Sequence, residues 1–145
     1  MKPVVACLLL SMLGVAAAAQ KQDSQLRVTD EEARKLVLTA LPSSAKQLPK
    51  FGLEGGLDSR DPRFYLFTAY WEGAPNGSMV IGNYAVDTST ADVWNAAMAC
   101  QELSTPVLRR IQKEVRSRIG LSQSQYRKVK RRCPLELEDE TPPGR

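Results

Sequence analysis

The stretch Phe64–Trp71, which reads FYLFTAYW, decides the fold class of this 145-residue chain. Apolar and aromatic side chains fill both alternating sets of positions in it, as in a β-strand that is covered on both faces. Residues 72–78 follow with glycine, proline and an Asn-Gly pair, which favour a tight turn. Residues 79–86 read as a second strand and residues 92–95 as the start of a third. The sequence therefore predicts an antiparallel meander of three to four strands.

A helix is predicted before the meander, over residues 30–41. The Thr29 hydroxyl and the Glu32 side chain stand three residues apart, which is the spacing of a capping box. Pro42 ends the helix, and the Pro-, Gly-, Ser- and Asp-rich residues 42–63 are predicted to be a connecting loop. One apolar stripe follows the helix at intervals of three and four residues: Ala33, Leu36, Val37, Ala40 and Leu41.

One or two basic helices are predicted after the meander. Thr105 followed by Pro106 is typical of a helix start, and Gly120 is typical of a helix end. Ser122 and Gln125 form a second capping box, and Pro134 ends the second helix. The predicted fold class is α+β: the N-terminal helix packs on the antiparallel three- to four-stranded meander, and the basic C-terminal helices follow.

The N-terminal residues have the three parts of a secretory signal peptide. Lys2 supplies the positive charge, an apolar run follows, and four alanines precede a polar stretch. We therefore expect a signal peptide over 1–19, a flexible linker over 20–28, a single α+β domain over 29–134 and an acidic disordered tail over 135–145. The apolar run is shorter than the roughly 20 residues that span a bilayer, so no transmembrane segment is expected after cleavage. The predicted location is the periplasm or the extracellular space.

Two cysteines are left once the signal peptide and its Cys7 are removed, namely Cys100 and Cys133. In an exported chain of this size such a pair is expected to form a disulfide. The alternative is a reactive thiol at Cys133, whose pKa the neighbouring Arg131 and Arg132 would lower.

The composition excludes several classes of chemistry. The chain has no histidine, which removes Ser-His-Asp and Cys-His catalysis and histidine-ligated zinc. It also lacks a phosphate-binding loop, a dinucleotide-binding fingerprint and a Cys-x-x-Cys motif. Asp58, Asp61 and Asp87 do not have the spacing of a calcium loop. We expect neither a cofactor nor a metal.

Positive charge is concentrated in the predicted C-terminal helices. Residues 109–132 hold ten Lys and Arg and one acidic residue, although the whole chain carries only +4. Such a run is either a solvated helix face or a surface for an anionic partner. Our hypothesis is a non-enzymatic binding module, of which an inhibitor is one version, that engages an acidic protein or an anionic envelope component. Aromatic residues hardly interleave with the charges, which argues against nucleic acid. The candidate partner-binding residues are Arg109, Arg110, Lys113, Arg116, Arg127, Lys128, Lys130, Arg131 and Arg132.

Two alternatives stay open. In the first, the chain is a small hydrolase whose carboxylates Glu72, Asp87 and Asp92 meet at one end of the sheet, although aspartates in tight turns usually cap the turn. In the second, it is an envelope protein that associates with itself through an exposed aromatic face of the sheet. The N-terminal helix can cover only one face of the strand Phe64–Trp71. Its other face is either covered by the C-terminal helices, as part of the core, or exposed as in this second alternative. The oligomeric state does not follow from the sequence.

One part of the sequence resembles a known family. Residues Tyr84–Trp94, read together with Glu31-Glu32-Ala33, are similar to the hairpin and helix of PepSY-type domains, which share the outline of cystatin-like folds. Ala91 stands where that pattern has glycine. The resemblance covers residues 29–96 and implies a small exported bacterial domain in which a helix packs on an antiparallel sheet. It also implies an inhibitory or binding role without a catalytic site.

Overall fold

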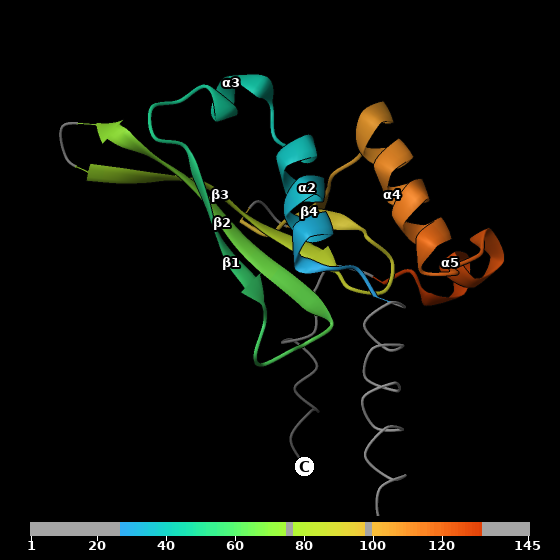
Figure 1. Ribbon diagram of the computed structural model, residues 1–145. Helices are drawn as coiled ribbons and strands as arrows, with labels where there is room; N and C mark the ends of the chain where they lie inside the picture. Colours follow the sequence, from blue (N-terminus) through green and yellow to red (C-terminus); the bar gives the residue numbers. More distant parts are fainter. Residues whose placement is uncertain (1–26, 75–76, 98–99, 132–145) are drawn as a thin grey trace, which may run out of the picture.

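The computed structural model describes residues 27–74, 77–97 and 100–131, and these form an α+β architecture (Figure 1). The N-terminal helix is followed by a sheet and then by further helices, which confirms the predicted fold class. The elements in chain order are α2 Asp30–Ala40, α3 Ser43–Lys46, β1 Gly52–Leu57, β2 Phe64–Ala74, β3 Gly77–Asp87, β4 Val93–Asn95, β5 Gln101–Glu102, α4 Pro106–Arg118 and α5 Gln123–Val129.

The sheet is a five-stranded antiparallel meander in the order β1-β2-β3-β4-β5. The predicted number of three to four strands was therefore too low. Strand β1 lies in the stretch that was predicted to be a loop. The prediction missed it because its sequence GLEGGL lacks the β-branched and aromatic residues that indicate a strand. A Cβ atom at Gly52 would lie 2.3 Å from the Tyr70 ring, and one at Gly55 would lie 2.1 Å from the Leu66 carbonyl oxygen. At Gly55, whose φ is +123°, the nearby backbone of β2 thus requires glycine, whereas at Gly52 the Tyr70 ring would have to move. The same glycines hide the strand from sequence analysis.

Helix α2 begins with the predicted capping box. The Thr29 hydroxyl accepts a hydrogen bond from the Glu32 backbone N–H at 3.2 Å, and the Glu32 carboxylate accepts one from the Thr29 N–H at 2.9 Å. Ala33, Leu36 and Val37 of the predicted apolar stripe are buried. The stripe is therefore part of the core, as its spacing indicated.

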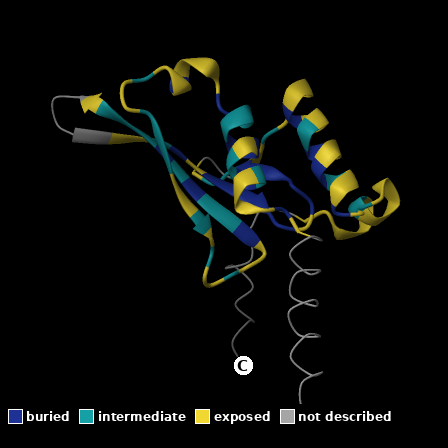
Figure 2. Cartoon of the chain, viewed as in Figure 1, coloured by how far each residue is buried: buried dark blue, intermediate teal, exposed yellow. Residues whose placement is uncertain are grey.

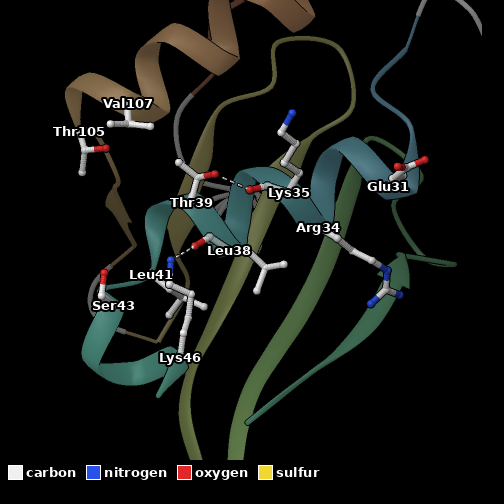
Figure 3. Close-up of a pocket in the computed structure, with 10 residues that line it drawn as sticks. All are labelled: Glu31, Arg34, Lys35, Leu38, Thr39, Leu41, Ser43, Lys46, Thr105 and Val107. Atoms are coloured by element: carbon white, nitrogen blue, oxygen red, sulfur yellow. Dashed lines mark hydrogen bonds between the residues drawn. The ribbon is translucent and has the colours of Figure 1, made fainter. Parts of the chain in front are cut away.

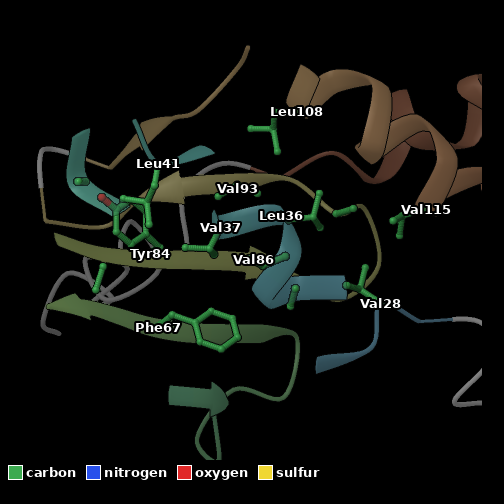
Figure 4. Packing of buried hydrophobic residues seen from close by; sticks show 14 residues of the cluster. Val28, Leu36, Val37, Leu41, Phe67, Tyr84, Val86, Val93, Leu108 and Val115 are labelled. Carbon is green, nitrogen blue, oxygen red and sulfur yellow. The ribbon is translucent and has the colours of Figure 1, made fainter. Parts of the chain in front are cut away.

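Helices α2 and α4 lie on the same face of the sheet and enclose the main core between them and the strands (Figures 1 and 4). Leu36 of α2 and Leu108 of α4 are both 0% exposed. Figure 2 shows that α4 has a buried side and an exposed outer side, whereas α5 has no buried residue. The main cluster also contains Phe67, Tyr84, Val86, Val93 and Val115.

The opposite face of the sheet has its own smaller cluster. Phe64, Ala85 and Trp94 are 1%, 0% and 2% exposed, and the Phe64 and Trp94 rings meet edge to face at 6.1 Å. Because side chains alternate along a strand, this cluster lies opposite the main core. The expectation that the C-terminal helices cover this face was wrong for α4, whose buried side chains belong to the main core. Both faces of the central strands are nevertheless partly core.

The packed domain begins before its predicted boundary at Thr29. Val28, which was assigned to the flexible linker, is 2% exposed. Its N–H donates to the Thr88 carbonyl oxygen at 2.8 Å, and its carbonyl accepts from the Tyr65 hydroxyl at 3.1 Å. The predicted signal peptide, residues 20–26 of the linker and the acidic tail lie outside the described residues. In the part of the chain that is described, no helix is long and apolar enough to cross a membrane.

Candidate functional site

The outer side of α4 carries the first part of the predicted basic surface. Thr105 caps the helix by accepting a hydrogen bond from the Leu108 N–H at 3.1 Å, as the Thr-Pro pair predicted. The helix turns its apolar side to the core, so that Arg109, Arg110 and Lys113 are exposed. The Arg109 guanidinium donates to the Ser104 hydroxyl at 2.9 Å.

Helix α5 and the residues after it carry the second part. Arg127, Lys128, Lys130 and Arg131 are all exposed. The Lys130 ammonium lies 2.8 Å from the Glu102 carboxylate of β5, and this hydrogen bond raises the pKa of Lys130. Arg132 and Cys133 lie outside the described residues, so both the role of Arg132 and the Cys100–Cys133 disulfide stay predictions.

Arg116 does not belong to this surface, and its prediction as a partner-binding residue is corrected by its environment. Its side chain is 15% exposed and its Nη2 atom lies 2.6 Å from Oδ1 of Asp92. Its Nε atom donates to the Thr90 carbonyl oxygen at 2.6 Å, and its guanidinium covers the Tyr126 ring at 3.8 Å. Arg116 faces the turn between β3 and β4 rather than solvent, so its charge is already satisfied within the fold.

Asp92 is the centre of this buried network. Its side chain accepts hydrogen bonds from the Tyr126 hydroxyl at 2.9 Å and from the Thr90 hydroxyl at 2.9 Å, in addition to Arg116. Burial raises the pKa of Asp92, against the lowering by Arg116, Tyr126 and Thr90. Since α5 buries no side chain, this helix is held to the sheet by polar contacts, namely the Tyr126–Asp92 bond and the Lys130–Glu102 ion pair. Sequence analysis did not single out Tyr126, because its partner Asp92 lies 34 positions away in the chain.

The turn between β3 and β4 holds an alanine in an unusual conformation. Ala91 has φ +59°, a left-handed value that favours glycine, at the position where the PepSY-type pattern has glycine. The Ala91 carbonyl accepts a hydrogen bond from the buried Gln112 side chain of α4 at 3.0 Å. Gln112 was not predicted as an anchor, although it follows Leu108 by four residues and so lies on the buried stripe of α4.

Glu72 of the hydrolase alternative is not brought together with Asp87 and Asp92, which share the turn between β3 and β4. Asp87 is 1% exposed, and its Oδ1 atom accepts from the Ser89 and Thr90 N–H groups at 2.6 and 3.1 Å, which is turn capping. Glu72 lies near the far end of β2, where its carboxylate is 3.4 Å from the Lys50 ammonium. Phe64 pairs with Asp87 and Glu72 with Ser78, which separates the two acids by eight residues of strand, about 26 Å.

A hollow of about 720 Å³ opens on the outer side of α2, between α3 and the start of α4 (Figure 3). Lys35 and Lys46 are exposed at its rim. Val107, the residue after the helix-starting proline of α4, is 51% exposed beside it. Sequence analysis did not single out this hollow, because its residues come from three separate elements. They are Glu31, Arg34, Lys35, Leu38, Thr39, Leu41, Ser43, Lys46, Thr105 and Val107.

Comparison with known proteins gives one informative similarity. No protein-family model matches the chain, and no curated protein matches it. The chain is similar to a chain in the structure of a type VI secretion system effector–immunity complex from Pseudomonas protegens, with 26% sequence identity and a TM-score of 0.57. The similarity covers 70% of this chain and 85% of that chain, so it extends over most of both folds. The resemblance to PepSY-type domains stays a prediction.

Proposed function

We propose that this protein is a non-enzymatic binding protein of the immunity or inhibitor type, and that it holds an acidic surface of another protein against its basic helices. The observation that carries the proposal is the similarity to a chain of an effector–immunity complex, over 70% of this chain. Each chain of such a complex is bound to a protein partner. The geometry of α4 and α5 supports the assignment of the binding surface.

The charges of this surface are available for a partner. Arg110, Lys113, Arg127 and Lys128 are exposed and make no ion pair within the described ranges, 27–74, 77–97 and 100–131. We define these four residues as the basic face. Clustered charges of one sign attract an oppositely charged surface, speed up association and select the partner by its charge.

An acidic protein fits this surface better than a nucleic acid does. Tyr126 is the one aromatic residue among the described charges of α4 and α5, and its ring lies under the Arg116 guanidinium. That ring is therefore not free to stack on an unpaired base, which is how single-stranded nucleic acids are commonly held. The predicted export of the chain supports the same choice.

Internal use of the acidic residues supports a role without catalysis. Asp87 and Asp92 are both 1% exposed and accept hydrogen bonds from the turn and from α4 and α5. A carboxylate that acts on a substrate must reach it within hydrogen-bond distance.

We further propose that the protein is exported, with cleavage after Ala19 and a disulfide bond between Cys100 and Cys133. Mass spectrometry of the purified protein, before and after reduction, checks both points.

Charge reversal tests the binding role. The wild-type protein and two double variants, R110E/K113E and R127E/K128E, are immobilised and exposed to an extract of the source organism, and bound proteins are eluted with salt and identified. We expect the wild-type protein to retain an acidic protein that leaves at moderate salt, because ion pairs at a surface are screened. Each double variant should retain at most about a tenth as much, corresponding to the loss of about 1.4 kcal/mol.

The matched control is the double variant K50E/R60E, which makes the same change in net charge elsewhere. The side chains of Lys50 and Arg60 are 76% and 84% exposed and lie outside α4 and α5. This control should retain the partner as well as the wild-type protein does. Equal loss in all three variants, or a wild-type protein that retains no acidic protein, would overturn the proposal.

A further inference from the structure

The hollow between α2, α3 and α4 has an apolar wall and a positively charged rim. Leu38 comes from the last turns of α2, Leu41 directly follows this helix, and Val107 comes from the first turn of α4; all three line the hollow (Figure 3). Val107 is 51% exposed, so a partner that removes this apolar side chain from water gains binding free energy. Lys35 also lines a second, smaller hollow of about 200 Å³, together with Ile111 of α4.

The two lysines at the rim have positive charges that no carboxylate of the described residues pairs with. The Lys46 ammonium donates to the Leu38 carbonyl oxygen at 3.0 Å, which holds it at the edge of the hollow. Lys35 is exposed and lines both hollows. Arg34 differs, because its guanidinium is 2.6 Å from the Asp30 carboxylate and also bonds to the Leu53 and Gly55 carbonyls of β1.

We infer that this hollow receives a segment of an acidic protein partner, with an apolar side chain against Leu38 and Val107 and carboxylates on Lys35 and Lys46. The inference rests on the proposed function and specifies which part of the partner is recognised. An apolar contact surrounded by ion pairs is the arrangement that concentrates binding energy at protein interfaces. The basic face would attract the partner by charge alone, whereas this hollow would select an acidic segment that also carries an apolar side chain.

The chemistry of the hollow favours this occupant over a simple polyanion. A polyanion without apolar groups would leave Val107 and Leu38 in water. A purely apolar segment would leave Lys35 and Lys46 without counter-charges. Only a segment that combines both kinds of side chain matches the wall and the rim together.

Two synthetic peptides test the inference on the protein purified after expression of the full chain. The first is the acetylated hexapeptide Glu-Glu-Leu-Leu-Glu-Glu, and the second has serine in place of both leucines. Binding is followed by the amide signals in nuclear magnetic resonance spectra of the labelled protein. We expect the leucine peptide to shift the signals of Leu38, Val107 and Lys35, and to bind at least about fivefold more tightly than the serine peptide, because leucine is apolar and serine is not.

Charge variants locate the binding site. The double variant K35E/K46E should weaken binding of the leucine peptide at least about fivefold, which is the expected effect of two rim ion pairs. The control K50E/R60E, with the same change in net charge, should bind like the wild-type protein. V107D should weaken the leucine peptide more than the serine peptide, because it places a charge in the apolar wall.

Several results would overturn the inference. The first three are equal binding of both peptides, signal shifts confined to α5, and no shift with either peptide. The fourth is a weakening of leucine-peptide binding by R110E/K113E that equals the weakening by K35E/K46E. A dimer in sedimentation that V107D dissociates would also overturn it, because a second copy of the chain would then occupy the hollow. The proposed function is judged separately by the extract experiment. If the captured protein is lost with the basic-face variants but kept with K35E/K46E, only the assignment of the hollow fails.

Discussion

Helices α4 and α5 are both basic but are held in different ways. Both begin with a hydroxyl cap, and both carry lysine and arginine along most of their length. Helix α4 buries Leu108, Gln112 and Val115 in the main core, whereas α5 buries none of its residues. The 13 residues of α4 pack on α2, while the seven residues of α5 depend on polar contacts at Tyr126 and Lys130.

The comparison teaches that a basic helix is not by itself a binding surface. In α4, the same basic run contains exposed Arg110 and Lys113 and the internal anchor Arg116. In α5, the aromatic residue Tyr126 anchors the helix through its hydroxyl group, which donates to Asp92. The exposed charges of both helices therefore depend on buried contacts, and breaking those contacts should affect the two helices unequally.

The largest difference between the helices is expected from truncation of their apolar side chains. Leu108→Ala should lower the free energy of unfolding of the domain by about 2–5 kcal/mol, because it leaves a cavity in the core. Val129→Ala in α5, where the side chain is 40% exposed, should change it by less than about 0.5 kcal/mol. Urea unfolding followed by circular dichroism measures both. Equal effects would show that α5 is as much part of the core as α4.

A smaller effect is expected from Tyr126→Phe, which removes the hydroxyl that donates to Asp92. The free energy of unfolding should fall by about 1–2 kcal/mol, since the buried Asp92 carboxylate loses one of its hydrogen-bond partners. Hydrogen exchange should become faster in residues 123–129 and stay unchanged in residues 106–118, because the core contacts of α4 are untouched. The matched control is Tyr70→Phe on β2, away from both helices. Parallel acceleration in α4 and α5 would mean that they open as one unit.

The smallest effect concerns the polar contact of α4 with α2. Partial burial alone would raise the pKa of Glu32, but hydrogen bonds from Arg118 and Thr29 lower it below its ordinary value of 4.5. A carboxyl whose pKa is lowered on folding stabilises the fold above its unfolded pKa, and this stabilisation is lost as the pH falls through the folded pKa. The Arg118 ion pair that is lost, at 2.6 Å and partly exposed, is worth at most about 1 kcal/mol.

Glu32→Gln isolates this contribution, because glutamine can keep the capping hydrogen bond while it removes the charge. The variant should be less stable than the wild-type protein at neutral pH, and the difference should vanish once the pH has fallen below the folded pKa of Glu32. Unfolding by urea across this pH range measures it. A difference that persists in acid would assign the role of Glu32 to packing or capping instead of charge.

The helix starts could be predicted from the sequence because they depend on residues three positions apart. The capping boxes at Thr29 and Ser122 and the cap at Thr105 all form as expected. The central strands could be predicted for a similar reason, since their aromatic and branched side chains favour extended backbone locally. Strand β1 could not, because its glycines serve the approach of a strand that lies next to it only in the fold.

Sequence by itself determined the α+β class, the helix caps, the central hairpin and the strong basic character of residues 109–132. Only the tertiary structure decided which of those charges face solvent. Arg116 is internal because the β3–β4 turn places Asp92 opposite it, although the two residues lie 24 positions apart. Local backbone preferences act between near neighbours, so a sequence reports them directly. The availability of a charge depends on what packs against it, which is a property of the whole fold.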